Sequence, residues 1–288
     1  MRYTKRPTLL ISCVLLIGTP ACREQVPPPS TEVVLSRAAE VPLDPAHAAW
    51  QQAPEYTAVL IPQDLVEPRQ LTTTTAAVRV RAITDDDEVA FRLEWDDPTR
   101  NDLEGASRFS DACAVQVPQK VEAHVPAPQM GEPDRLVEIA YWNASWQAHV
   151  DGRGDSITDL YPNATVDHYP FEAAPLVNNP ATQKAMAVRY APARAVGNPV
   201  AGPPSTPVQD LVAEGPGTLA FASSSTSRGK GVRTIGGWAV VIVRDELPAS
   251  AGMASSQVAF AVWDGSQEEV GARKMRTGWI PTVQQEFP

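Results

Sequence analysis

Two neighbouring segments alternate apolar and polar residues, which is the pattern of a β-hairpin with one buried face. Residues 77–83 read AVRVRAI, and in residues 88–95 the apolar side chains of Val89, Phe91, Leu93 and Trp95 recur at every second position. Successive side chains of a strand point to opposite sides, so these four share one side. The aspartates at 85–87 favour a turn between the two strands. The chain must therefore build a sheet that buries one of its faces.

Further short runs rich in β-branched and aromatic residues predict strands at 113–117, 136–142, 237–244 and 257–263. No segment shows sustained helical periodicity with caps. With 28 prolines and 17 glycines, this succession predicts an all-β fold, an antiparallel β-sandwich with long connecting loops. We expect one domain over 33–288. Its longest irregular stretch, 152–236, is expected to cover a cofactor or to contact a partner.

The N-terminus has the pattern of a bacterial lipoprotein signal. Basic residues precede an apolar stretch at 9–18 that is too short to span a bilayer, and Cys22 follows a small residue. We predict a signal peptide over 1–21, a lipidated Cys22 and a proline-rich tether over 22–32. The protein would then be periplasmic and anchored to the membrane by lipid. The alternative is an ordinary signal peptide with a chance cysteine.

The cysteine count limits the redox chemistry. Once Cys13 leaves with the signal and Cys22 is acylated, Cys113 stands alone, which leaves no disulfide framework and no iron-sulfur ligand set. The motif Cys-x-x-Cys-His does not occur, so a haem would not be attached covalently. The four scattered histidines, His47, His124, His149 and His168, are expected to be surface or hydrogen-bonding residues rather than metal ligands.

The chain is strongly acidic. Its formal net charge is −10, and removing a signal that holds three basic residues and no acid takes it to −13. Such a charge argues against nucleic acid as a partner, because phosphates require lysine and arginine. It suits docking to a basic partner such as a soluble cytochrome c, although acidity also serves solubility alone.

Three stretches resemble the haem-b-binding gamma subunits of periplasmic molybdenum enzymes of the ethylbenzene dehydrogenase type. They are 258–265 (VAFAVWDG) followed by 268–274 (EEVGARK), 111–118 (DACAVQVP), and 129–131 (QMG) leading into 140–142 (AYW). The resemblance implies a β-sandwich with one non-covalent haem b. It further implies a complex with a molybdopterin catalytic subunit and an iron-sulfur subunit, in which this chain passes electrons to a cytochrome c or another redox partner and catalyses nothing.

The resemblance also implies the axial ligands of the haem iron. Met130 occupies the family's methionine position, and Lys274 matches its lysine, with Lys230 in the run 228–231 as the competitor. A thioether is a neutral, polarisable ligand, whereas the amine must be desolvated to be neutral. The alternatives are a methionine that fills a gap in the core and a lysine on the surface.

Arg273, beside Lys274, is a candidate partner for a haem propionate, with a surface salt bridge as the equal alternative. For Trp142, Trp146, Trp238 and Trp263 we expect packing in the sandwich, with contact to the porphyrin as the alternative.

Two rival functions belong to other classes. A haem-free β-sandwich lipoprotein that binds carbohydrate or protein would use the same strands and tryptophans. A hydrolase is a weaker hypothesis, because the motifs Gly-x-Ser-x-Gly and His-Glu-x-x-His do not occur. A phosphate-binding glycine loop is also missing from the sequence. The aspartates at 85–87 lack the spacing of an EF-hand loop.

Overall fold

A computed structural model describes most of the chain from residue 30 onward. The described residues are 1, 30–85, 87–103, 105–122, 124–154, 159, 161–164, 178–189, 191–196, 198, 201–202, 204–248 and 256–285. Apart from Met1, the predicted signal peptide lies outside them, as do most of the predicted tether and Cys22, for which we predicted lipidation. The first strand begins at Val33, where the domain was predicted to start.

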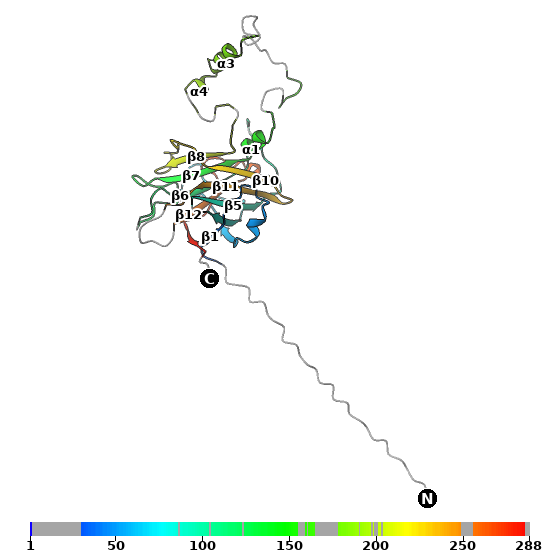
Figure 1. Cartoon of the computed structure of the whole chain (residues 1–288), viewed down its shortest axis with the longest axis vertical. Coiled ribbons are helices and arrows are strands. Elements are labelled where there is room, and N and C mark those ends of the chain that lie inside the picture. Colours follow the sequence, from blue (N-terminus) through cyan, green and yellow to red (C-terminus); the bar gives the residue numbers. More distant parts are fainter. Residues whose placement is uncertain are drawn as a thin grey trace.

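The strands form two facing layers (Figure 1). Layer A has the order β10-β11-β5-β4-β1-β14, with β2 also paired to β4. Its strands are β1 (Val33–Arg37), β2 (Tyr56–Val59), β4 (Ala77–Thr84), β5 (Glu88–Asp96), β10 (Arg228–Arg233), β11 (Gly237–Asp245) and β14 (Ile280–Gln284).

Layer B has the order β12-β6-β7-β8-β9, with β13 paired to both β12 and β3. Its strands are β3 (Ile61–Pro62), β6 (Ala112–Pro118), β7 (Val137–Asn143), β8 (Val208–Ala213), β9 (Ala220–Phe221), β12 (Gln257–Trp263) and β13 (Met275–Arg276). Two residue pairs between β12 and β14 join the layers at one edge.

The main core lies between the layers, which confirms the predicted sandwich. The four apolar residues of β5 face inward and meet Cys113, Val115 and Val117 of β6 and the alternate residues of β12. Aromatic side chains cross the gap edge to face: the Phe91 and Phe260 ring centroids are 5.8 Å apart, and those of Trp142 and Trp238 are 5.2 Å apart. Trp142 and Trp238 thus pack in the core, as expected.

The sheet is not wholly antiparallel, because β1 pairs in parallel with both β4 and β14. The stretch 152–236 is also less irregular than predicted. It contains β8, β9 and β10, and the helices α3 (Pro180–Arg189) and α4 (Pro192–Ala195), which lie beyond the sandwich in Figure 1. The sequence of β10, RGKGVR, lacks the composition of a strand, because Gly231 accommodates the buried ring of Trp142 and Gly229 lies close against Val208.

Short helical segments, which the sequence analysis did not predict, complete the fold. They are α1 (Ala144–Val150) and the 3-10 turns η1 (Ala48–Gln51) and η2 (Gly265–Gln267). The Asn143 side chain caps α1 by accepting hydrogen bonds from the backbone N–H groups of Ser145 and Trp146. Among the described residues, no helix has both the length and the apolar character needed to cross a membrane.

Candidate functional site

A pocket lies on the outer face of layer B, on the side of the sheet away from the core. In β6 and β12 the residues between the core positions point outward, and several of them are small: Ala112, Ala114, Ala259 and Ala261. With Trp263, Ile139 and their neighbours, most of these alanines form a second apolar cluster. Small side chains leave room above the sheet, so this face can accommodate a flat apolar group.

The loop between β6 and β7 carries Met130 to this face. The loop is fastened to the sheet, because Trp279 Nε1 donates to the Pro126 carbonyl at 2.6 Å and Gln116 Nε2 donates to the Pro128 carbonyl at 3.0 Å. Met130 has a φ of 69°, in the left-handed region that strains a residue other than glycine. Such conformations are held only where the surroundings impose them, and they are common at binding sites.

Strand alternation in and before β13 directs Lys274 to the same face. Met275 is fully buried in the main core, so its neighbours Lys274 and Arg276 point outward, and Arg276 pairs with Ala261 of β12. The backbone is fixed by a 3.0 Å hydrogen bond from Gln63 N–H to the Lys274 carbonyl. The Lys274 Nζ lies 4.9 Å from the ring centroid of Trp263, a cation–π contact.

Met130 and Lys274 therefore line one pocket. It is a small, partly open depression with a cavity volume of about 30 Å³, well below the roughly 300–1,000 Å³ that is usual for small-molecule sites. Alanines, Ile139 and Trp263 supply apolar walls, and Gln63, Gln116 and Arg276 supply polar groups. The lining residues all lie outside the stretch 152–236, which we predicted to cover a cofactor or to contact a partner. That stretch does reach the Met130 loop, because the Gly215 N–H donates to the Met130 carbonyl at 2.8 Å.

The charges of the pocket are positive. Burial, together with the neighbouring charge of Arg276, lowers the pKa of the Lys274 amine from 10.5 to about 8, although the side chain as a whole is only half-buried. Arg276 is buried, and its guanidinium donates to Gln63 Oε1 at 3.3 Å and to the Thr277 carbonyl at 3.2 Å. Within the described structure, no acidic side chain lines the pocket. The site thus favours a negatively charged ligand that an amine nitrogen and a thioether sulfur can coordinate.

Lys230 lies far from this arrangement, on the opposite outer face of the sandwich. It stands in β10 opposite Val241, which packs against Trp50 on the outer side of layer A. Its Nζ is 3.6 Å from Asp44 Oδ1. The fold thus brings Met130 together with Lys274 and separates it from Lys230.

Arg273 is half-buried and does not line the pocket, and the positive charge nearest the lysine belongs to Arg276. The sequence analysis missed Arg276. The signal that could have found it is its position two residues after Lys274 in a strand, which places both on one side. Trp263 lines the pocket and donates its indole N–H to the Gly271 carbonyl at 3.1 Å. Trp146 packs edge to face on Tyr141 at 5.7 Å.

Comparison with known proteins gives one family and few relatives. The family described as ethylbenzene dehydrogenase matches residues 47–275, a range that contains both Met130 and Lys274. A protein of Haloferax mediterranei named "Putative respiratory nitrate reductase heme subunit ORF7" is 24% identical over 288 residues, which is 96% of this chain and 82% of that protein.

Solved structures with a similar fold are distant. A family 9 carbohydrate binding module from Caldicellulosiruptor kristjanssonii in complex with cellotriose covers 89% of this chain and 94% of its own, at 9% identity and a TM-score of 0.41. The corresponding complex with glucose has a TM-score of 0.37. Similarities this weak carry no argument about ligands.

Proposed function

Because the chain belongs to the ethylbenzene dehydrogenase family, we propose that it is a haem-binding, electron-transfer subunit of a molybdopterin oxidoreductase. The observation that carries the proposal is the shared pocket of Met130 and Lys274, two residues 144 positions apart that the fold brings to one face. The name of the relative in Haloferax mediterranei, a heme subunit of a respiratory nitrate reductase, supports the same function.

In the chemistry of its side chains, though not in its volume, the pocket fits a haem. Met130 and Lys274 would bind the haem iron, and the alanines and Trp263 would contact the apolar part of the group. Arg276 is placed to pair with a propionate, a role that we also predicted for Arg273. When bound, the haem iron supplies a one-electron carrier.

Lys274 must release its ammonium proton before its nitrogen can bind a metal. Burial already lowers the pKa of this amine, so the free energy needed to deprotonate it at neutral pH is smaller than for a surface lysine. Met130 contributes a neutral, polarisable thioether that favours the reduced state of iron and raises its potential. Met130 and Lys274 together thus form a ligand set suited to electron transfer rather than to substrate binding.

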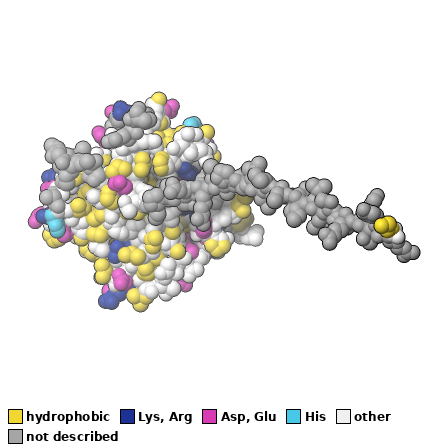
Figure 2. Space-filling model, turned by 90° about the horizontal axis from the view of Figure 1, so that it is seen from below, with side chains coloured by type: hydrophobic (Ala, Val, Ile, Leu, Met, Phe, Trp, Pro, Cys, Tyr) yellow, Lys and Arg dark blue, Asp and Glu magenta, His cyan; other side chains and the backbone are white. Residues whose placement is uncertain are grey.

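The finer parts of the proposal rest on the sequence. They are a single non-covalent haem b, a periplasmic location with a lipid anchor at Cys22, and a complex with a molybdopterin subunit and an iron-sulfur subunit that passes electrons to a cytochrome. Figure 2 shows acidic and basic side chains interspersed with hydrophobic ones on one face of the molecule. The negative charge is thus spread over this face, which supports general solubility as much as a localised docking site.

Haem titration of the purified protein tests the proposal. We expect a Soret band that saturates at one haem per chain, and haem that acidified organic solvent extracts completely. A protein that remains colourless when it is co-expressed with its catalytic partner would contradict the proposal and favour the haem-free binding lipoprotein. Co-purification of molybdenum and iron-sulfur subunits from the native host tests the proposed complex separately.

A further inference from the structure

A second cluster of chemically distinctive residues lies at one end of the sandwich, apart from the residues that line the haem pocket. Asp97 directly follows β5, Asp111 directly precedes β6, and Asp264 directly follows β12. One carboxylate oxygen from each of the three lies within 4.8 Å of the other two. Their exposed fractions are 1%, 0% and 8%, respectively. Three buried like charges repel one another strongly unless a positive charge compensates them.

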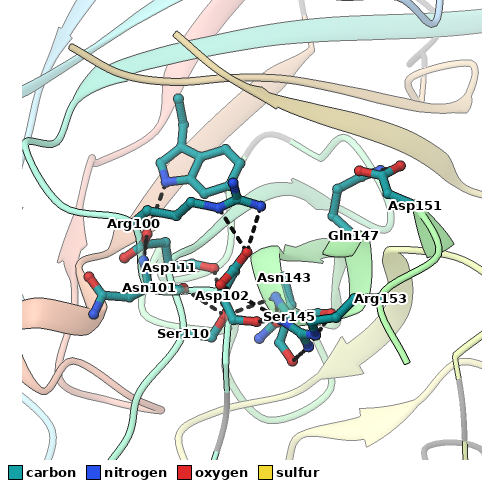
Figure 3. Close-up of polar contacts among 11 residues, drawn as sticks. Arg100, Asn101, Asp102, Ser110, Asp111, Asn143, Ser145, Gln147, Asp151 and Arg153 are labelled. Atoms are coloured by element: carbon teal, nitrogen blue, oxygen red, sulfur yellow. Dashed lines mark hydrogen bonds and ion pairs between the residues drawn. The ribbon is translucent and has the colours of Figure 1, made fainter. Parts of the chain in front are cut away.

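Backbone and indole N–H groups hold most of the carboxylate oxygens. Asp111 Oδ2 accepts from the Asn101 N–H at 2.8 Å and from Trp238 Nε1 at 2.9 Å, and Asp111 Oδ1 accepts from the Gly265 N–H at 2.9 Å. Figure 3 shows Asp111 within a network in which the preceding residue, Ser110, bonds to Asn143 and Ser145. The loops that carry the carboxylates are thus fixed by contacts of their own.

One fully buried oxygen of the cluster lacks any such partner among the described residues. Asp97 Oδ1 accepts hydrogen bonds from the Thr99 N–H and hydroxyl, at 2.8 and 2.9 Å. Asp97 Oδ2 is fully buried and accepts no hydrogen bond from the residues that the structure describes. A buried carboxylate oxygen without a donor is costly and rare, which points to a ligand that this part of the chain does not itself provide.

The charge of Arg233 offsets the cluster only in part, because it acts to lower the pKa of Asp97 whereas burial has the larger, opposite effect. Within the described structure, no basic side chain forms an ion pair with Asp97, Asp111 or Asp264. The guanidinium of Arg233 donates to the Asp97 backbone carbonyl instead, at 2.9 Å. A fourth buried acid adds to the charge, because Glu269 Oε2 accepts from the Asp264 N–H at 2.8 Å.

We propose that Asp97, Asp111 and Asp264 together bind one divalent cation of the calcium class. The candidate ligands are carboxylate oxygens from three separate loops, which suits the flexible coordination of Ca²⁺ better than the strict octahedron of Mg²⁺. Histidine and cysteine, which zinc prefers, are absent from the cluster. The ion ties the ends of β5 and β12 to the start of β6. Since Asp264 follows Trp263, the ion also fixes the turn beside the haem pocket.

Burial also raises the pKa of Asp111 to about 6, with a further contribution from the charge of Asp97. Burial of this kind disfavours the charged carboxylate, and a bound cation would compensate it.

Terbium luminescence tests the site directly. Tb³⁺ substitutes for Ca²⁺, and Trp238, whose indole nitrogen contacts Asp111, lies close enough to sensitise its emission. We expect the mature protein to give sensitised Tb³⁺ emission that excess Ca²⁺ displaces. Its melting temperature should rise with Ca²⁺ and fall in chelator, because a ligand that binds only the native state stabilises it.

The Asp97→Asn variant removes the unpartnered oxygen and one charge with little change in shape. It should weaken Tb³⁺ binding by about tenfold or more and abolish the response of the melting temperature to Ca²⁺. The matched control is Asp96→Asn, which alters the exposed neighbouring carboxylate that pairs with Arg79 and should leave both readings unchanged.

Two outcomes would overturn the proposal. One is equal Tb³⁺ binding by the wild type and the Asp97→Asn variant. The other is a wild-type melting temperature that ignores Ca²⁺ while Asp97→Asn stabilises the protein in chelator, which would show that the cluster shares a proton instead. Haem binding, read from the Soret band, is a separate measurement, so the two proposals can fail independently.

Discussion

Lys274 combines two features that seldom occur together in a lysine, a buried amine and a neighbouring guanidinium. Both lower the pKa of the amine, to about 8. Lysine is ordinarily a solvated surface residue, so its burial beside Arg276 lowers the stability of the haem-free protein. That loss is offset when the neutral amine acquires a ligand, which is the physical basis for assigning Lys274 a binding role.

The stability of the haem-free protein should therefore depend on this lysine in alkaline solution. In the folded state Lys274 loses its proton near pH 8, whereas in the unfolded chain it does so near 10.5. Between these values the unfolded state binds more protons, so the free energy of unfolding gains a contribution that rises with pH. Urea unfolding from pH 7 to 10 should show this rise in the wild type and lose it in Lys274→Met. Parallel pH profiles for the wild type and Lys274→Met would contradict it, and Lys230→Met is the surface control.

A second prediction concerns Met130, whose backbone is in the left-handed region. Variants at this position can distinguish the effect of backbone strain from the loss of the thioether ligand. Met130→Gly relieves the strain and Met130→Ala does not. In the absence of haem, the free energy of unfolding of the glycine variant should therefore exceed that of the alanine variant by about 1 kcal/mol. Both variants lack the thioether and should lose haem affinity to the same extent. Urea unfolding and haem titration measure the two effects. A glycine variant no more stable than the alanine variant would show that the backbone at 130 is not strained.

The family resemblance pointed to Met130 and Lys274 as ligands, with Lys230 as the competitor, and Arg276 could have been found from its position two residues after Lys274. The three aspartates could not, because Asp97, Asp111 and Asp264 are up to 167 positions apart in the chain. No local pattern links residues so distant. Long-range packing brings them together, and it becomes visible only in the folded chain.

At the level of elements, the periodic strands were predictable and the irregular ones were not. The predicted strand at 257–263 has the bounds of β12, and the hairpin of β4 and β5 follows the alternation at 77–95. β10 was not predicted because its glycines are required for packing against Trp142 and have low strand propensity. The seven residues of α1 are too few to show helical periodicity.

The glycine at 231 should be essential to the packing of β10. A Cβ there would lie 2.2 Å from a ring carbon of Trp142, which cannot move within the core. We expect Gly231→Ala to lower the free energy of unfolding by about 1–3 kcal/mol. The control is Gly236→Ala, where a Cβ meets no atom within 4 Å, with an expected change of about 0.5 kcal/mol or less. Equal losses in denaturant unfolding of the two variants would contradict the packing argument.

In the molecule as a whole, the hydrophobic core, the pocket and the carboxylate cluster occupy three separate parts of the sandwich. The space between the layers is filled by aromatic and branched side chains, the outer face of layer B holds the pocket, and one end of the sandwich holds the carboxylate cluster. Composition and periodicity predicted the class of fold. Strand order determines the direction of β1 and the side of the sandwich on which each lysine lies. It depends on long-range pairing, which local sequence patterns do not reveal.

The haem spectra of ligand variants test whether Met130 and Lys274 bind the haem iron. We predict a low-spin, six-coordinate haem in the wild type, loss of haem or a lower potential in Met130→Ala, and a high-spin component in Lys274→Ala. Lys230→Ala, which alters the opposite face of the sandwich, should leave the absorption and electron paramagnetic resonance spectra unchanged. The assignment of Lys274 would be wrong if the spin state changed in Lys230→Ala but not in Lys274→Ala. The assignment of both ligands would be wrong if the spin state responded to neither Met130 nor any lysine.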